Sequence, residues 1–292
     1  MKAAAFSYVR PKRLNEVLLL LAEHGDEARL LAGGQTLLAT LNMRLSEPAL
    51  LIDLQSIAEL KGLNLQGDYL RIGALVTHTE IENSALVAQH APLLSAAAPH
   101  IAHRAIRNLG TLGGSIAYGD PAAEWPACLL ALNGVVVVRN LTTERRIAAN
   151  DFFTGLYTTA LGTDEIIVAC EFPIAQAGQV FHFTELARRH GDYAVVGLAA
   201  AATLSSGGMQ DVRLAWLGVG SIPLRSLAAE QALQGQLLTE NNIATTVAAL
   251  RAELNPLPDL THSDAAKRQL AAVLLKRTLQ AWMRPAAQAV AV

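Results

Sequence analysis

Ala28-Arg29-Leu30-Leu31-Ala32-Gly33-Gly34-Gln35-Thr36 is the stretch from which the fold of this chain can first be worked out. It joins an apolar run typical of a β-strand to a double glycine and a hydroxyl residue. The pattern that follows predicts a short helix over 36–43 and a second strand over 49–53. Strand, glycine turn, helix and strand in this order predict a small β-α-β unit whose helix begins at an anion-binding turn.

A second double glycine lies in Thr111-Leu112-Gly113-Gly114-Ser115, and Asp120 and Pro121 follow it. Glycine lets a backbone approach a ligand closely, and N–H groups with neighbouring hydroxyls bind phosphate oxygens. Two such turns in one chain indicate a dinucleotide cofactor that carries the reaction itself. A lone double glycine is more often only a tight turn. Neither turn fits the G-x-G-x-x-G pattern, so an ordinary Rossmann domain is not predicted.

The composition limits the partners that this chain can have. Of its 292 residues, 52% are hydrophobic and only 16% are charged, which predicts a large buried core and a surface for a partner protein. The net charge of −2 and the scarcity of basic runs argue against nucleic-acid binding. No apolar run reaches the roughly 18 residues of a membrane span, and the N-terminus does not resemble a signal peptide. We therefore expect a cytoplasmic protein.

The residue types that bind metals are scattered along the chain. Cys128 and Cys170 are far apart in apolar surroundings and are expected to be buried thiols, so no iron–sulfur cluster is predicted. His100 and His103 lie close in sequence, but no carboxylate follows at the spacing of a metal site. No nucleophile or general base stands out, which suits a protein whose cofactor does the chemistry.

The order and separation of the two glycine turns resemble those of the FAD-binding medium subunits of molybdenum hydroxylases, the xanthine dehydrogenase and carbon monoxide dehydrogenase medium-chain family. The loops of that family read A-G-G-Q-S and T-x-G-G-N, and an aspartate follows the second. A third stretch, Phe183 to Ala194, is also similar, and the resemblance covers nearly the whole chain. Thr36 keeps the hydroxyl of the first loop, whereas Ser115 lacks the amide of the family's asparagine.

The resemblance implies an α+β fold. A PCMH-type (vanillyl-alcohol-oxidase-like) FAD-binding domain would occupy 1–175, as two α/β subdomains over about 1–54 and 55–175. A C-terminal medium-chain domain would occupy 176–292, with a three-stranded antiparallel sheet and helices. The apolar runs at 180–186, 195–204 and 212–219 are the expected strands of that sheet.

The resemblance also implies which residues hold the FAD pyrophosphate. Those of the first loop are Ala32, Gly33, Gly34, Gln35 and Thr36, and those of the second are Thr111, Gly113, Gly114 and Ser115. Asp120 would accept a hydrogen bond from a ribose hydroxyl, or would cap the helix that follows Pro121, and both roles can coexist.

The third stretch would lie beside the isoalloxazine ring. Its arginine pair, Arg188 and Arg189, precedes Asp192 and Tyr193 as in the family. Tyr193 would gate the flavin, or would be a core residue at the start of a strand. Asp192 would lie near the cofactor or form an ion pair with the arginines. Ile167 stands where the family has an apolar residue near the flavin, and plain core packing accounts for it equally well.

The function implied is that of an FAD-binding electron-transfer subunit. A large partner chain would hold the molybdenum cofactor, and a small partner chain would hold two [2Fe-2S] clusters. The three chains would form a heterotrimer, with a dimer of heterotrimers as a possible assembly. Electrons would pass through FAD to an external acceptor such as NAD, oxygen or a quinone. Two alternatives stay open: a self-sufficient FAD-dependent oxidoreductase of the vanillyl-alcohol-oxidase type, and an assembly subunit that has lost FAD.

Overall fold

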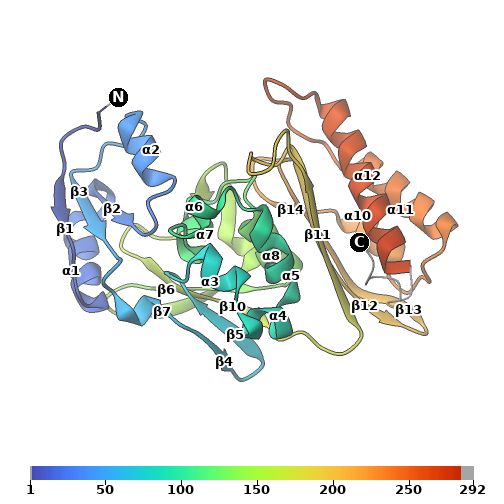
Figure 1. Cartoon of the computed structure of the whole chain (residues 1–292), viewed down its shortest axis with the longest axis horizontal. Helices are drawn as coiled ribbons and strands as arrows, with labels where there is room; N and C mark the ends of the chain where they lie inside the picture. Colours follow the sequence, from blue (N-terminus) through green and yellow to red (C-terminus); the bar gives the residue numbers. More distant parts are fainter. Residues whose placement is uncertain (1, 284–292) are drawn as a thin grey trace.

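The computed structural model describes residues 2–283, and Figure 1 shows three successive sheets along the molecule. The first is a small parallel sheet in the order β1-β3-β2. Its elements are β1 (Ser7–Val9), α1 (Leu14–His24), β2 (Ala28–Leu31), α2 (Leu37–Asn42) and β3 (Leu50–Asp53). The predicted β-α-β unit is confirmed, with the first glycine loop between β2 and α2.

The second sheet is antiparallel and has the order β4-β5-β10-β6-β7. Its strands are β4 (Leu63–Gln66), β5 (Tyr69–Gly73), β6 (Val135–Arg139), β7 (Glu144–Ala148) and β10 (Ile166–Pro173). The helices between them are α3 (His78–Glu82), α4 (Ala85–His90), α5 (Pro92–Ala97), α6 (Arg104–Arg107), α7 (Leu112–Tyr118), α8 (Glu124–Ala131) and α9 (Ala149–Phe152). The minor elements of the first two parts are η1 (Gly25–Glu27), η2 (Ala58–Leu60), η3 (Ala98–His100), β8 (Phe153–Gly155) and β9 (Thr158–Thr159).

The third sheet is antiparallel and has the order β11-β12-β13-β14. Its strands are β11 (Gln179–Leu186), β12 (Val196–Ser205), β13 (Gly208–Leu217) and β14 (Leu224–Arg225). The helices are α10 (Leu227–Leu233), α11 (Glu240–Glu253) and α12 (Asp264–Met283). The three predicted strands are present, and β14 adds a fourth strand that the sequence did not predict. With two residues, β14 is too short to show an alternating pattern.

Both faces of this third sheet are buried. Neighbouring side chains of a strand point to opposite faces, so consecutive residues enter different cores. Ala199 belongs to the core of the central part of the molecule, whereas Ala200 packs with α12 and its neighbours. The first face lies against α5 and α8, and the second is covered by α10 and α12 (Figure 1). The sheet therefore closes two hydrophobic cores at once.

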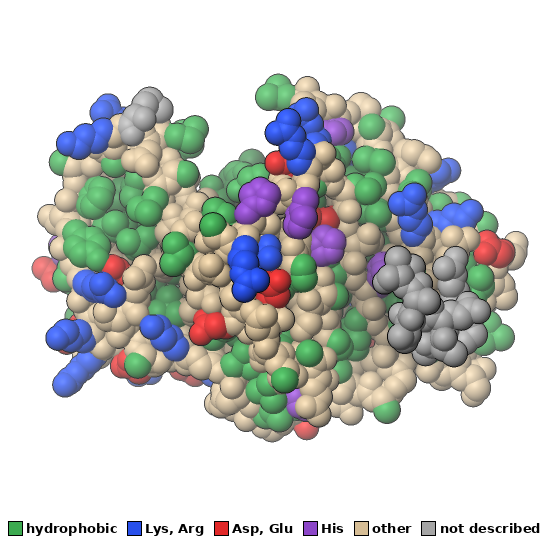
Figure 2. Space-filling view, in the orientation of Figure 1, with side chains coloured by type: hydrophobic (Ala, Val, Ile, Leu, Met, Phe, Trp, Pro, Cys, Tyr) green, Lys and Arg blue, Asp and Glu red, His purple; other side chains and the backbone are tan. Residues whose placement is uncertain are grey.

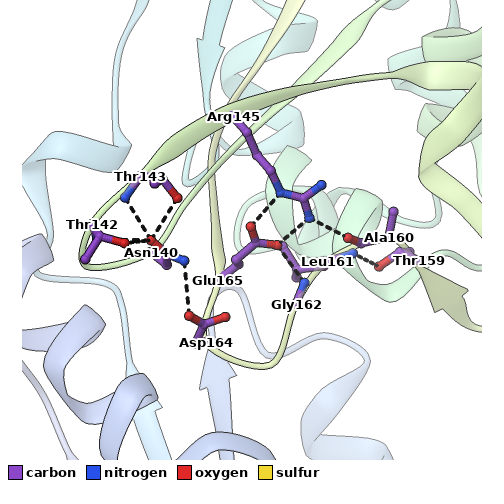
Figure 3. A network of polar contacts seen from close by, with 10 residues as sticks. All are labelled: Asn140, Thr142, Thr143, Arg145, Thr159, Ala160, Leu161, Gly162, Asp164 and Glu165. Atoms are coloured by element: carbon purple, nitrogen blue, oxygen red, sulfur yellow. Dashed lines mark hydrogen bonds and ion pairs between the residues drawn. The ribbon is translucent and has the colours of Figure 1, made fainter.

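A polar network fixes the β6–β7 turn to the loop that precedes β10 (Figure 3). Arg145 donates from Nε and Nη2 to the two carboxylate oxygens of Glu165, at 2.6 and 2.7 Å. The same Nη2 donates to the Ala160 carbonyl at 2.8 Å, and the N–H of Gly162 donates to Glu165. Asn140 in the turn donates to Asp164 at 3.1 Å.

Between residues 2 and 283, no helix is long and apolar enough to cross a membrane.

Candidate functional site

The two glycine loops lie against each other. A Cβ at Gly33 would overlap the carbonyl oxygen of Leu109 and would lie 2.8 Å from the Cα of Gly110. Gly110 directly precedes the second loop. At a further contact, a Cβ at Gly114 would lie 3.6 Å from the Cβ of Ala32. Segments about eighty positions apart in the sequence thus meet backbone to backbone at the edge of the first sheet.

The first loop presents a run of free backbone donors. Within the described part of the chain, the N–H groups of Gly33, Gly34, Gln35 and Thr36 donate no hydrogen bond. Gly34 has a φ of +72°, which favours glycine, and the amide of Gln35 donates back to the Gly33 carbonyl at 2.9 Å. Successive N–H groups in a partly buried turn form a concave site that binds anions.

The second loop is different, because the four N–H groups from Leu112 to Ser115 already donate within the protein. Gly113 donates to the Ala74 carbonyl at 2.9 Å, Gly114 to Thr111 Oγ1 at 3.1 Å and Ser115 to the Thr111 carbonyl at 3.1 Å. Gly113 is a glycine because a Cβ there would lie 2.5 Å from that of Ala74. The hydroxyl groups of Thr111 and Ser115 are among the groups that this loop can offer a ligand.

Asp120 does not cap the following helix. α8 begins only at Glu124, and Ala123 is its N-cap residue. Asp120 instead accepts a hydrogen bond from the N–H of Ala122 at 2.8 Å through Oδ1. Burial raises the pKa of this carboxyl group. Its Oδ2 receives no donor from the residues that the structure describes, so this oxygen remains able to accept one.

Tyr193 is at the surface and not in a core, with 69% of its area exposed. Partial desolvation raises its pKa, and the negative charge of Asp120 and the neighbouring Tyr118 and Tyr157 raise it further. The rings of Tyr118 and Tyr157 lie 5.1 Å apart. The charge of Asp120 therefore acts on Tyr193, which places the two groups in the same part of the molecule.

The other two candidates come from the third stretch and from β10. Asp192 is exposed, and no ion pair joins it to Arg188 or Arg189 in the described chain; its N–H donates to the Arg189 carbonyl at 3.1 Å. Ile167 is 3% exposed and packs in the central core beside a bulge in the β10–β6 pairing. Core packing accounts for Ile167.

Cys128 and Cys170 are both buried free thiols, as predicted.

His78 supports the second loop and was missed from the sequence. Its backbone N–H donates to the Gly110 carbonyl at 2.9 Å, and its Nδ1 accepts from Trp125 Nε1 at 2.9 Å. Burial lowers its pKa to about 4, and the positive charge of Arg107 lowers it further. A neutral histidine therefore links α8 to the start of the second loop. The sequence could not show this role, because it depends on the contact with Trp125, which is 47 positions away.

Two carboxyl groups near β11 were also missed. Glu185 has a side chain that is 6% exposed, and its Oε2 has no hydrogen-bond partner in the described residues. Burial raises the pKa of Glu124 on α8 to about 8, and the charge of Glu185 adds to this rise. Burial raises the pKa of the Cys128 thiol, and the charges of Glu124 and Glu185 raise it further. Neither glutamate belongs to a motif, so only the fold reveals the pair.

Comparison with known proteins decides the family. Residues 4–175 match the FAD binding domain in molybdopterin dehydrogenase, and residues 181–282 match the CO dehydrogenase flavoprotein C-terminal domain. The chain belongs to this family of FAD-binding subunits. The resemblance seen in the sequence is thereby confirmed, and so is the type of fold. The exact domain boundaries stay a prediction.

Several relatives of this FAD-binding subunit match it over almost their whole length. The nicotine 6-hydroxylase medium subunit of Paenarthrobacter nicotinovorans is 40% identical over 96% of this chain and 98% of its own. The carbon monoxide dehydrogenase medium chain of Hydrogenophaga pseudoflava is 33% identical over 96% and 98%.

Solved structures show the same likeness. Carbon monoxide dehydrogenase from H. pseudoflava, in a form lacking the Mo-pyranopterin moiety, superposes with a TM-score of 0.94 at 36% identity, covering 98% of this chain and 100% of that one. Quinoline 2-oxidoreductase from Pseudomonas putida 86 has a TM-score of 0.91 at 35% identity, over 97% and 100%.

The residues of this FAD-binding subunit suit the cofactor that defines its family. Four consecutive N–H groups in the first loop have no acceptor among the residues that the structure describes, and the oxygens of a pyrophosphate are acceptors that such a turn binds. Thr111 and Ser115 add hydroxyls from the facing loop, and Asp120 adds a carboxylate oxygen. The donors and the acceptor thus match a dinucleotide that carries two phosphates and a ribose.

Proposed function

We propose that this chain holds FAD with its pyrophosphate between the two glycine loops. The observation that carries the proposal is the row of N–H groups from Gly33 to Thr36, which have no acceptor in the described part of the chain and lie against the hydroxyl-bearing second loop. In this arrangement Ala32 and Gly33 set the contact with the second loop, while Gly34, Gln35 and Thr36 direct their N–H groups to the phosphates. Bound FAD would supply the redox chemistry, and the protein would bind and orient it.

The remaining candidate residues would contact other parts of the bound FAD. Asp120 accepts a hydrogen bond from a ribose hydroxyl through its free Oδ2. Tyr193, being exposed beside Asp120, screens the redox ring from solvent, and Asp192 sets the conformation of that segment. Replacing Tyr193 with alanine is then expected to keep FAD bound but to change its rate of reoxidation in rapid-mixing experiments.

We further propose that the chain works as the medium subunit of a cytoplasmic, heteromeric molybdenum hydroxylase. Relatives named as medium subunits or chains, matched over nearly their full length, support this. Electrons would come from [2Fe-2S] clusters on a small partner chain, after the molybdenum centre of a large one, in a dimer of heterotrimers. They would leave for an external acceptor such as NAD, oxygen or a quinone.

Ser115→Ala tests the grip on FAD. The Ser115 hydroxyl makes no hydrogen bond within residues 2–283, so its removal should leave the fold unchanged. Losing one hydrogen bond to a charged group should weaken FAD binding by roughly tenfold, whereas Ser115→Asn should restore it. Ser46→Ala, in the loop between α2 and β3, is the matched control.

The measurement is FAD affinity by fluorescence titration of the purified chain. Unchanged affinity in Ser115→Ala would contradict the place given to the second loop, and a chain that binds no FAD would contradict the whole proposal. Turnover of an organic substrate by the isolated, FAD-loaded chain would favour the self-sufficient oxidoreductase instead.

A further inference from the structure

Lys267 is a buried lysine of α12, far along the chain from the glycine loops. Lysine and arginine side chains usually lie at the surface, as Figure 2 shows for one face of the molecule. Only 6% of Lys267 is exposed, and no other lysine between residues 2 and 283 is buried. Burying a charge is costly unless it is paired and hydrogen-bonded, so the partners of this ammonium group define its role.

The ammonium group of Lys267 has two partners. Its Nζ donates to the carbonyl of Gly218, the residue after β13, at 3.0 Å and lies 3.0 Å from Oδ2 of Asp259. Oδ1 of Asp259 accepts from the N–H groups of Thr261 and His262, at 2.8 and 2.9 Å. The hydrogen bond from Thr261 and the contact with Lys267 hold the pKa of Asp259 well below its usual range. This carboxylate therefore stays charged and keeps the ammonium group beside the Gly218 carbonyl.

Gly218 is the point where three segments meet. Its φ is +78°, which favours glycine, and its N–H donates to the Pro121 carbonyl at 2.9 Å. A Cβ at Gly218 would overlap the carbonyl oxygen of Val195, at 2.7 Å. Its own carbonyl accepts from Lys267. A single residue thus connects α12 to the segment that contains Pro121.

The segment held by Gly218 carries Asp120, a candidate FAD-binding residue. The Asp120 carbonyl accepts from the N–H of Ala123 at 3.1 Å, and its Oδ1 accepts from that of Ala122 at 2.8 Å. Residues 120–123 therefore form one compact turn, which the hydrogen bond from Gly218 to Pro121 ties to the third sheet. A shift of Gly218 is passed to this turn and to Oδ2 of Asp120, the oxygen proposed to accept from the ribose.

We propose that Lys267 is a positioning residue for FAD, and that it acts through Gly218 to hold the Asp120 turn in place for the ribose hydroxyl. The inference rests on the proposed FAD function. Lys267 is not among the residues assigned to the cofactor. It acts through two successive hydrogen bonds, from its Nζ to Gly218 and from Gly218 to Pro121. A helix of the C-terminal part of the chain thereby sets how tightly the glycine-loop part holds FAD.

Lys267→Met tests this inference, because methionine keeps an apolar stem but has no donor for the Gly218 carbonyl. FAD should bind roughly tenfold more weakly, the loss expected when the hydrogen bond to Asp120 is no longer made. Asp120→Ala should lose about as much. Because both changes remove the same contact, the double variant should bind FAD no more weakly than Asp120→Ala alone. Fluorescence titration of the full chain measures these affinities. Lys276→Met, the same substitution at an exposed position of α12, is the matched control.

Hydrogen exchange of the wild-type chain gives a second measurement. Coupling between two sites is reciprocal, so FAD bound at Asp120 must also stabilise Gly218 and the loop beyond it. FAD should slow exchange at the N–H of Gly218 and at that of Leu257, which donates to the Val219 carbonyl at 3.0 Å. The N–H of Met209, near the opposite end of β13, should be slowed less, so it controls for general stabilisation by the ligand.

Wild-type FAD affinity in a folded Lys267→Met variant would overturn the inference. Additive losses in the double variant would also overturn it, because they would show that Lys267 does not act through Asp120. Equal slowing of exchange at Leu257 and Met209 would do the same. Should Lys267→Met fail to fold, the exchange experiment decides on its own. A chain that binds FAD but gives one of these contrary results refutes only this inference, whereas failure to bind FAD refutes the proposed function.

Discussion

At the scale of single residues, Gly33 and Gly113 are glycines for the sake of protein packing. Any side chain at Gly33 would run into the Leu109 backbone, and one at Gly113 would run into Ala74. The sequence identified both positions as parts of a cofactor loop, but it could not show that their closest neighbour is the protein itself. Of the four glycines in the two double-glycine turns, Gly34 alone has a positive φ, and its N–H donates no hydrogen bond within residues 2–283.

Gly33→Ala should therefore destabilise the FAD-free chain and not simply lower its affinity for FAD. The methyl group meets rigid backbone, so the two loops must separate, at a cost of about 1–3 kcal/mol. Thermal unfolding of the FAD-free protein measures this. Ser46→Ala, in the loop between α2 and β3, is the control, and an unchanged melting temperature in Gly33→Ala would refute the backbone contact.

His78 should make the chain sensitive to acid. Its pKa is about 4 in the folded protein and about 6.5 when unfolded. The unfolded state therefore binds a proton that the folded state does not, so stability is complete above pH 6.5 and falls as the pH drops toward 4. The limiting loss is about 3 kcal/mol from this residue.

Urea unfolding at several pH values checks this, with His78→Gln as the comparison. Glutamine can still accept from Trp125 but does not titrate, so its stability should change less between pH 6.5 and 4. His90→Gln, at the end of α4, should keep the wild-type dependence. If His78→Gln loses stability on acidification as steeply as wild type does, the titrating group lies elsewhere.

At the scale of elements, the polar network at the β6–β7 turn is the clearest place to test how one contact contributes to stability. Arg145→Ala removes the guanidinium that neutralises Glu165, whose carboxylate is mostly buried. The expected loss is about 1–3 kcal/mol, because the remaining carboxylate has lost its charged donor. Chemical denaturation measures it. FAD affinity should stay unchanged, and a large drop in it would mean that this turn also shapes the cofactor site.

Elements with a repeating pattern were predictable from the sequence, and those defined by distant contacts were not. The helix Leu14–His24 and the β6–β7 hairpin follow from apolar spacing and turn residues. β14 is too short to carry a pattern, and α8 begins later than Pro121 suggests. The candidate site divides in the same way. The glycine loops are local motifs, whereas His78 and Glu185 acquire their roles only from residues far away in sequence.

At the scale of the whole molecule, the third sheet belongs to two cores, so the family's two domains should not be separable. Phe183 and Leu217 pack into the central core with residues of α5 and α8. A fragment ending at residue 175 would expose this apolar surface to water. We expect it to aggregate or to melt well below the full chain, as light scattering and calorimetry would show. A monomeric, cooperative fragment would mean that the central core closes without the sheet.

The contact between Gly33 and Leu109 also bears on how members of this family can be recombined. Because the two loops meet backbone to backbone, the conformation of each loop must be complementary to that of the other. A chimera that takes residues 28–36 from one relative and 103–115 from another joins surfaces that did not evolve together. Crossover points that keep both segments from one parent should yield folded hybrids far more often than points that fall between them.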